Sequence, residues 1–157
     1  MVKAGVRIVR RFYTHVDDLM SDFPNASAVF NCTGLGARHL GGVQDEKMHP
    51  AKGQTILIEE PIVPLERMAI WSQPSLFGPG EFSHVFPRPL GGGIIIGGVR
   101  RDNEHDDSVD SSLAERAKKR ACQLCPELGK PEDLKVIRYN IGLRRGFPSY
   151  LHSSALN

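Results

Sequence analysis

Two short apolar runs on either side of a turn rich in proline and glycine constrain the fold of this chain most. Residues 83–86 (SHVF) end at Pro87, and residues 94–99 (IIIGGV) follow three glycines at positions 91–93. Short apolar and β-branched runs bounded by proline and glycine predict strands, and a turn between two such runs predicts an antiparallel hairpin. The sequence therefore predicts a fold that contains an antiparallel sheet.

Further strands and helices are predicted on both sides of this hairpin. The remaining predicted strands are residues 5–12, 28–32, 55–59 and 136–141, and the predicted helices are residues 16–23 and 111–124. In the second helix Leu113, Ala117 and Ala121 share one face, and Ser111 and Ser112 are candidates for its N-cap. One further helical turn is expected at residues 37–40, and a frayed tail is expected after Arg144. This mixture indicates an α+β fold.

Composition favours a protein that acts on small molecules. The 157 residues include 40% hydrophobic residues, which is enough for one globular domain. A net charge of +2 gives no strong field of one sign, so neither nucleic acid nor a membrane is expected as a partner. No apolar run approaches the roughly 20 residues of a membrane helix, and the N-terminus has no apolar signal core. We therefore expect an intracellular protein.

The cysteines provide a candidate motif with two interpretations. Cys32, Cys122 and Cys125 are the three cysteines, and their odd number cannot form a fully paired disulfide framework. Cys122 and Cys125 form a C-x-x-C motif, which is compatible with a redox pair or half of a zinc site. Because no second pair of cysteines follows, we favour two positions on one helix face and expect no metal site.

Two other features suggest binding sites but leave alternatives open. Gly34 and Gly36 follow a predicted strand and precede a helical turn, where backbone amides favour a phosphate. His39 occupies the position of the third glycine of a complete dinucleotide motif, so a simple tight turn remains an alternative. Arg144 ends an apolar strand, where a guanidinium can bind a carboxylate through two parallel hydrogen bonds. A salt-bridged or surface-directed arginine is the alternative there.

Several separated motifs together resemble the D-amino-acid oxidase family, especially its fungal members. The motifs are residues 30–37 (FNCTGLGA), 53–55 (GQT), 86–89 (FPRP), 97–98 (GG) and 139–144 (YNIGLR). Their order and spacing are similar to those of the family, and this combination is far more specific than any single motif. The resemblance implies an FAD-dependent oxidoreductase that converts D-amino acids and oxygen to 2-oxo acids, ammonia and hydrogen peroxide.

The resemblance also implies roles for individual residues. It places Cys32, Thr33 and Gly34 against the FAD and Gly142 near the flavin ring. Arg144 would hold the α-carboxylate of the substrate. His84 stands where the family commonly has a substrate tyrosine, and Arg100 stands where the aspartate-preferring branch has an arginine. The seven residues are thus expected to bind cofactor or substrate, and none is expected to act as an acid–base catalyst, because the protein mainly orients the substrate.

The resemblance further predicts how the chain is divided. Residues 1–48 would be a remnant of the FAD-binding domain, residues 49–138 the substrate-binding domain, and residues 139–157 a strand returning to the flavin domain followed by an irregular tail. The family's N-terminal G-x-G-x-x-G segment and C-terminal glycine-rich segment have no counterpart here, and Arg145 replaces a usual proline. We therefore expect a fragment that is inactive by itself.

Other expectations follow from a fragment of this family. A substrate domain without its partner would leave the strands at residues 55–58 and 94–96 partly uncovered. An acidic D-amino acid is an alternative substrate, and a decayed, non-catalytic relative that does not hold FAD is an alternative function. The resemblance allows a homodimer and a peroxisomal or cytoplasmic location, although Ala155, Leu156 and Asn157 do not form a peroxisomal signal at this C-terminus.

Overall fold

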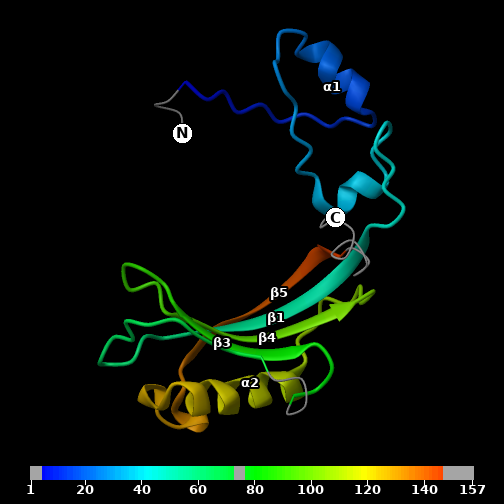
Figure 1. Ribbon diagram of the computed structural model, residues 1–157. Helices are drawn as coiled ribbons and strands as arrows, with labels where there is room; N and C mark the ends of the chain where they lie inside the picture. The colour runs from blue at the N-terminus through cyan, green and yellow to red at the C-terminus, as the bar shows by residue number, and fades with distance from the viewer. Residues whose placement is uncertain (1–4, 73–76, 147–157) are drawn as a thin grey trace, which may run out of the picture. The chain divides into compact units, whose positions relative to one another are not determined.

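The computed structural model describes residues 5–72 and 77–146 and divides the chain into two compact units (Figure 1). The N-terminal unit comprises Met1–Met48 with Phe147–Asn157, and the sheet unit comprises His49–Gly146. The tail predicted after Arg144 lies mostly outside the described residues. No helix within the described ranges is long and apolar enough to cross a membrane.

The sheet unit is built on five antiparallel strands in the order β2-β3-β4-β1-β5. The strands are β1 (His49–Ile58), β2 (Ala69–Trp71), β3 (Glu81–Pro87), β4 (Ile94–Asp102) and β5 (Val136–Gly146). The predicted β3–β4 hairpin and the predicted antiparallel sheet are confirmed. β1 begins earlier than predicted and β5 ends later, because pairing between these two strands extends from Ile58 and Val136 to His49 and Gly146.

Helix α2 (Ser111–Leu124) covers one face of this sheet (Figure 1). The predicted bounds are confirmed, but the N-cap is Asp110, whose carboxylate accepts a hydrogen bond from the amide of Leu113 at 2.9 Å. Short 3-10 helices, η3 (Pro126–Leu128) and η4 (Pro131–Asp133), connect α2 to β5. The predicted helix face packs as expected, since Ala117 and Ala121 lie in the core.

The core of the sheet unit corrects one expectation about exposed surface. Ile56, Ile58, Ile94 and Ile96 are each at most 1% exposed, and they belong to one buried cluster with residues of α2. The expectation that the strands at 55–58 and 94–96 would be uncovered is therefore wrong for these core positions. Helix α2, which follows these strands in the sequence, covers these positions; we had expected that only a missing domain could cover them.

The N-terminal unit contains α1 (Val16–Asp22) and the 3-10 helix η2 (Gly34–Arg38). The predicted helix at 16–23 is confirmed, and the expected turn at 37–40 forms slightly earlier, as η2. The strands predicted at 5–12 and 28–32 are wrong, because neither segment forms a ladder with another described segment. A strand pattern gives a strand only where a neighbour accepts its hydrogen bonds.

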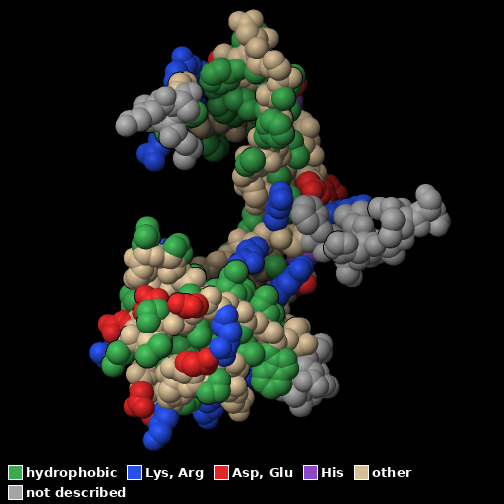
Figure 2. Space-filling model, turned by 60° about the vertical axis from the view of Figure 1, so that its left-hand side comes forward, with side chains coloured by type: hydrophobic (Ala, Val, Ile, Leu, Met, Phe, Trp, Pro, Cys, Tyr) green, Lys and Arg blue, Asp and Glu red, His purple; other side chains and the backbone are tan. Residues whose placement is uncertain are grey.

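Large apolar side chains are exposed in these two segments. Ile8 is 77% exposed, Phe12 90% and Phe30 84%. Figure 2 shows such hydrophobic side chains at the surface of the N-terminal unit. Uncovered apolar surface of this kind is typical of a segment that packs against another part of a protein.

Candidate functional site

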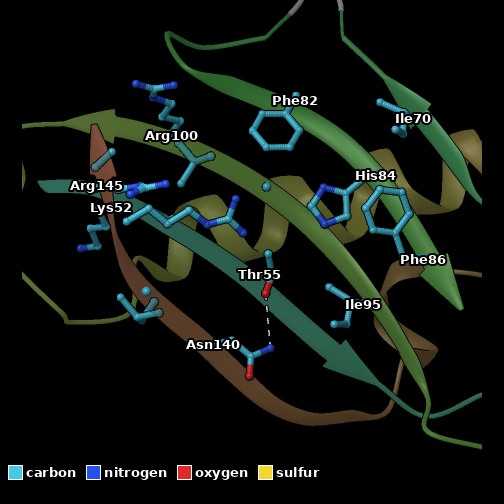
Figure 3. Close-up of a pocket in the computed structure, with 17 residues that line it drawn as sticks. Lys52, Thr55, Ile70, Phe82, His84, Phe86, Ile95, Arg100, Asn140 and Arg145 are labelled. Atoms are coloured by element: carbon cyan, nitrogen blue, oxygen red, sulfur yellow. Dashed lines mark hydrogen bonds between the residues drawn. The ribbon is translucent and has the colours of Figure 1, made fainter. Parts of the chain in front are cut away.

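A cavity of about 520 Å³ lies on the sheet face opposite α2 (Figure 3). Strand alternation explains the location, because odd-numbered residues of β1 such as Thr55 face the cavity while Ile56 and Ile58 face the helix. The base of the cavity consists of small residues, and its larger apolar side chains come from β2, β3, β4 and β5. The small residues are Ala51, Gly53, Gly98 and Gly142, and the larger apolar ones are Ile70, Phe82, Phe86, Ile95, Val99 and Ile141.

An irregularity in strand pairing turns Arg100 into this cavity. Gln54 pairs with Val99 whereas Thr55 pairs with Gly97, so β4 has one extra residue opposite β1. Such a bulge reverses which face the later side chains occupy. Ile94 and Ile96 face the helix. Arg100 is also an even-numbered position of β4, yet it lines the cavity. Regular pairing would have directed the Arg100 guanidinium toward the core.

Glycine is required at the bulge by close contacts. A Cβ atom at Gly98 would lie 3.0 Å from the carbonyl oxygen of Gln54 and 3.3 Å from Cε1 of His84. The first contact is with backbone, which cannot rotate away as a side chain can. The close approach of β4 to β1 and to the His84 ring therefore depends on the absence of a side chain at this position.

The pairing register brings four predicted site residues around the base of one cavity. His84 pairs with Gly97, and the row continues through Thr55 to Asn140, whose Nδ2 donates to Thr55 Oγ1 at 3.3 Å. In the next row Gly53 separates Arg100 from Gly142. Arg144 pairs with Ala51 one row further along. The structure thus brings together His84, Arg100, Gly142 and Arg144 in one cavity.

The charged residues lining the cavity are all basic. They are Lys52, Arg100, Arg144 and Arg145, and no carboxylate of the described residues lines it. Two of these cations have acidic partners outside the cavity. Lys52 Nζ lies 2.9 Å from Asp106 Oδ2, and Arg100 Nε donates to Asp102 Oδ1 at 3.0 Å. Figure 3 shows Lys52, Arg100 and Arg145 grouped at one end of the cavity, with His84 and Phe86 toward the other.

Arg144 differs from Lys52 and Arg100 in having no acidic partner in the described part of the chain. Its guanidinium makes no hydrogen bond or ion pair with residues 5–72 or 77–146. A guanidinium presents several donors in a fixed plane that matches a carboxylate. Within the described part of the chain, the cavity therefore offers an anion a planar guanidinium that no acidic side chain engages, above small residues.

His84 is a buried polar side chain in the middle of the cavity wall. It is 7% exposed, its ring stacks on Phe86 with 4.6 Å between centroids, and Phe82 lies at 5.5 Å on the same strand face. Its Nδ1 has no hydrogen-bond partner among the described residues. Burial, and then the positive charge of Arg144, lowers the pKa of His84 below its ordinary value, so the imidazole is neutral at pH 7.

The predicted cofactor residues Cys32, Thr33 and Gly34 lie in the N-terminal unit. Asn31 Oδ1 accepts hydrogen bonds from the Thr33 amide at 3.1 Å and from its hydroxyl at 2.7 Å, which forms a local turn. Gly34 has φ of +60°, a conformation that favours glycine, and Cys32 is exposed. The turn is followed by η2, a five-residue 3-10 helix rather than an α-helix.

Sequence reasoning missed several residues of the cavity. Lys52, Phe82 and Asn140 were not singled out as site residues, although Phe82 and Phe86 each lie two positions from His84 along the strand and so share its face. That alternation is a signal that the sequence contained. Nothing in the local sequence of Lys52 indicates its position, which depends on the pairing of β1 with both β4 and β5.

The C-x-x-C motif lies in the core. Cys122 and Cys125 are free and buried, and burial raises the pKa of both thiols. Among the described residues no group of three or more His, Cys, Asp or Glu side chains is arranged to hold a metal ion. The buried positions agree with the interpretation as packing residues.

We expect a thiol reagent to distinguish these cysteines. Cys32 is exposed and should react within the mixing time of a colorimetric thiol titration, whereas Cys122 and Cys125 should react only after denaturation, since a buried thiol is both protonated and inaccessible. The Cys32→Ser variant should then show no fast thiol. Rapid modification of two or three thiols in the native protein would contradict this assignment.

Comparisons with known proteins assign a family. The model of the family described as "FAD dependent oxidoreductase" matches residues 2–152. The chain is 35% identical over 147 residues to a D-amino-acid oxidase of Schizosaccharomyces pombe, covering 92% of the chain and 40% of that protein. It is 28% identical to a D-amino-acid oxidase of Fusarium vanettenii over 91% of the chain, which again corresponds to 40% of the relative. The chain thus spans about two fifths of these relatives.

A solved structure has a similar fold. Glycine oxidase from Geobacillus kaustophilus matches 73% of the chain and 28% of its own length, with a TM-score of 0.55 and 19% identity. At this identity the match supports the fold and carries no information on the substrate.

Proposed function

The chain belongs to the family of FAD-dependent oxidoreductases, and from this membership we propose that it supplies the substrate-binding part of a D-amino-acid oxidase. The reaction would convert a D-amino acid and oxygen to a 2-oxo acid, ammonia and hydrogen peroxide. The observation that carries the proposal is the Arg144 guanidinium, which has no acidic partner among residues 5–72 and 77–146 and lines a cavity with apolar walls and no carboxylate from these residues. In this proposal residues 1–48 belong to the FAD-binding domain and residues 49–138 to the substrate-binding domain, with residues 139–157 returning toward the former.

The residues of the cavity fit a planar cofactor ring. A Cβ atom built at Gly142 would meet no atom within 4 Å, and one at Gly53 would meet only backbone oxygens at 3.6 and 3.8 Å. Paired glycines on neighbouring strands leave flat backbone surface, which a ring can approach closely. We infer that Gly142 contacts the flavin ring and that Cys32, Thr33 and Gly34 contact the rest of the FAD. When bound, the flavin would accept the hydride from the substrate Cα.

The chain's own residues would bind and orient the substrate. Arg144 would hold the α-carboxylate through two hydrogen bonds, and this contact would fix the position of Cα along β5. Phe82 and Phe86 would exclude water from one side of the cavity. The ring of His84, held between them, would contact the substrate beside Arg144. Orientation of this kind selects one enantiomer, because only one arrangement about Cα presents its hydrogen to the ring.

The proposal is tested by peroxide release. The flavin-loaded protein that includes this chain should release hydrogen peroxide and the matching 2-oxo acid from D-alanine and should leave L-alanine unchanged. Absence of peroxide from any D-amino acid would contradict the proposal. A protein that in addition holds no FAD, and so lacks flavin absorbance, would instead agree with the alternative of a non-catalytic relative.

Arg100 makes an acidic D-amino acid a specific alternative substrate. The bulge in β4 directs it to the same cavity as Arg144, across Gly53 from Gly142. We expect Arg100→Ala to lower kcat/KM for D-aspartate by up to about fivefold, since an exposed charge pair contributes up to about 1 kcal/mol. D-Alanine, which has no second carboxylate, should change by less than about twofold. Equal losses with both substrates, measured side by side, would assign Arg100 a structural role.

A further inference from the structure

One side chain in the cavity can exchange a proton near neutral pH. The titratable residues lining it are Lys52, His84, Arg100, Arg144 and Arg145. Lysine and arginine are ordinarily protonated at pH 7, and among the described residues neither a carboxylate, a cysteine nor a tyrosine lines the cavity. His84 is therefore the single candidate for proton transfer among the residues that line this cavity.

The surroundings of His84 keep its imidazole neutral and without a partner. Arg100 of β4 and Arg144 of β5 lie on its face of the sheet. Lys52 and Arg145 line one end of the cavity but alternate along their strands with Ala51 and Arg144, which places them on the other face. On the α2 side Glu81 accepts hydrogen bonds from Arg116 and Arg120. Neither ring nitrogen makes a hydrogen bond to any residue in the described part of the chain. A neutral imidazole retains one nitrogen lone pair that can accept a proton.

The proposed reaction requires that the substrate lose a proton from nitrogen. An α-amino acid is a zwitterion at neutral pH, and its ammonium nitrogen has no lone pair. Removal of hydride from Cα needs that lone pair, because it forms the C=N bond of the imino product. In addition, a cavity lined by cations and no carboxylate disfavours an ammonium group. The same charges that attract the carboxylate therefore promote deprotonation of the amine.

We propose that His84 accepts the proton of the substrate α-ammonium while Arg144 holds the α-carboxylate. One N–H bond of the ammonium breaks, its electron pair stays on the amine nitrogen, and a new N–H bond forms on the imidazole. The imidazolium then releases this proton to solvent. The inference rests on the proposed oxidase function and adds an acid–base role to a residue for which the sequence had suggested substrate contact alone.

The pH profile of His84→Gln tests this role. Glutamine retains a polar side chain but cannot accept a proton at neutral pH. We expect kcat/KM for D-alanine to fall at least a hundredfold at pH 7, which is the lower end of general-base effects. At alkaline pH, where the free amino acid is itself deprotonated, the two proteins should differ by less than about threefold. A merely structural role would lower the rate by the same factor at every pH.

Chemical rescue provides a second test of the same step. Imidazole added to the His84→Ala protein should raise its rate at pH 7 at least about tenfold, and the rate should increase with imidazole concentration. The matched control is Phe82→Ala, which opens the same wall of the cavity without removing a base and should not respond to imidazole. Absence of rescue together with parallel pH profiles would overturn the inference.

The protonation state of His84 can be measured without flavin and without turnover. In NMR spectra of this chain, the His84 Cε1–H signal, assigned by its loss in His84→Gln, should titrate below the ordinary value of 6.5, and Arg144→Gln should raise that pKa. Titration above pH 7 would overturn the inference, because the imidazole would be protonated before substrate arrives. If no D-amino acid is oxidised at any pH, the proposed function fails and the inference fails with it. Oxidation with parallel profiles refutes the inference alone.

Discussion

Replacing Arg144 with alanine should lower kcat/KM at least a hundredfold for every D-amino acid. The guanidinium lies in a cavity with apolar walls and has no acidic partner in the residues described. Arg144 is exposed in this structure, and in the proposed enzyme the bound substrate and flavin would desolvate it. Loss of one member of a desolvated, hydrogen-bonded charge pair costs on the order of 2–5 kcal/mol, and about 2.7 kcal/mol corresponds to a factor of a hundred. Because every substrate has an α-carboxylate, the loss should not depend on the side chain.

Arg138→Ala is the matched control for this experiment. Arg138 lies on the same strand, is exposed, and does not line the cavity. Its removal should change kcat/KM by less than about twofold, as expected for a surface substitution. Near-normal efficiency of Arg144→Ala, or equal losses in the two variants, would show that Arg144 is not the carboxylate-binding residue.

Replacing Glu81 with alanine should lower the free energy of unfolding by about 3–5 kcal/mol, the range for breaking a buried ion pair by removing one partner. Glu81 Oε1 accepts a hydrogen bond from Arg116 Nη2 at 2.7 Å, and Oε2 accepts one from Arg120. The side chains of Glu81 and Arg120 are 5% and 8% exposed. The variant would leave the Arg120 charge buried without a carboxylate.

The ion pairs of Glu81 with Arg116 and Arg120 also predict how the loss of stability in Glu81→Ala depends on pH. Burial acts to raise the pKa of Glu81, but the hydrogen bonds from Arg116 and Arg120 outweigh it, so the pKa is lowered. A lowered pKa in the folded state means that the stabilisation is present above the ordinary value of 4.5 and is lost as pH falls through the folded value. The difference between the wild type and Glu81→Ala should therefore shrink in acid.

Urea unfolding followed by circular dichroism measures this difference. Glu115→Ala is the control, because Glu115 forms an exposed pair with Lys118 on the same helix, and it should cost less than about 1 kcal/mol. A Glu81→Ala protein as stable as the wild type at pH 7 would contradict the assignment of Glu81 and Arg120 as a buried, mutually dependent pair.

The sequence predicts those parts of the fold whose signals are local. The β3–β4 hairpin carries its own turn residues, and α2 carries its own apolar stripe and stop at Pro126, so both were predicted closely. The strands expected at 5–12 and 28–32 have the right alternation but no neighbour to pair with in the described chain. Pairing is a non-local property, and alternation alone does not supply it.

The candidate site was only partly predictable, because its residues are brought together by non-local strand pairing. The motif ending at Arg144 and the positions of His84 and Arg100 were found through the family resemblance, and the structure places these residues in one cavity. That Arg100 faces the cavity depends on the one-residue bulge opposite Gln54, which period-2 reasoning across β4 would miss. His84 of β3 and Arg144 of β5 line the same cavity although β4 and β1 lie between their strands, an arrangement that depends on the order and register of the whole sheet.

The most direct test of the central claim is the reduction of the flavin by substrate without oxygen. When the flavin-loaded protein that includes this chain is mixed anaerobically with D-alanine, the visible absorbance of the oxidised flavin should disappear. L-Alanine should leave the band unchanged, and so should D-alanine mixed with the Arg144→Ala protein at a concentration that fully reduces the wild type. A band that persists with every D-amino acid, or that L-alanine bleaches equally well, would contradict the account.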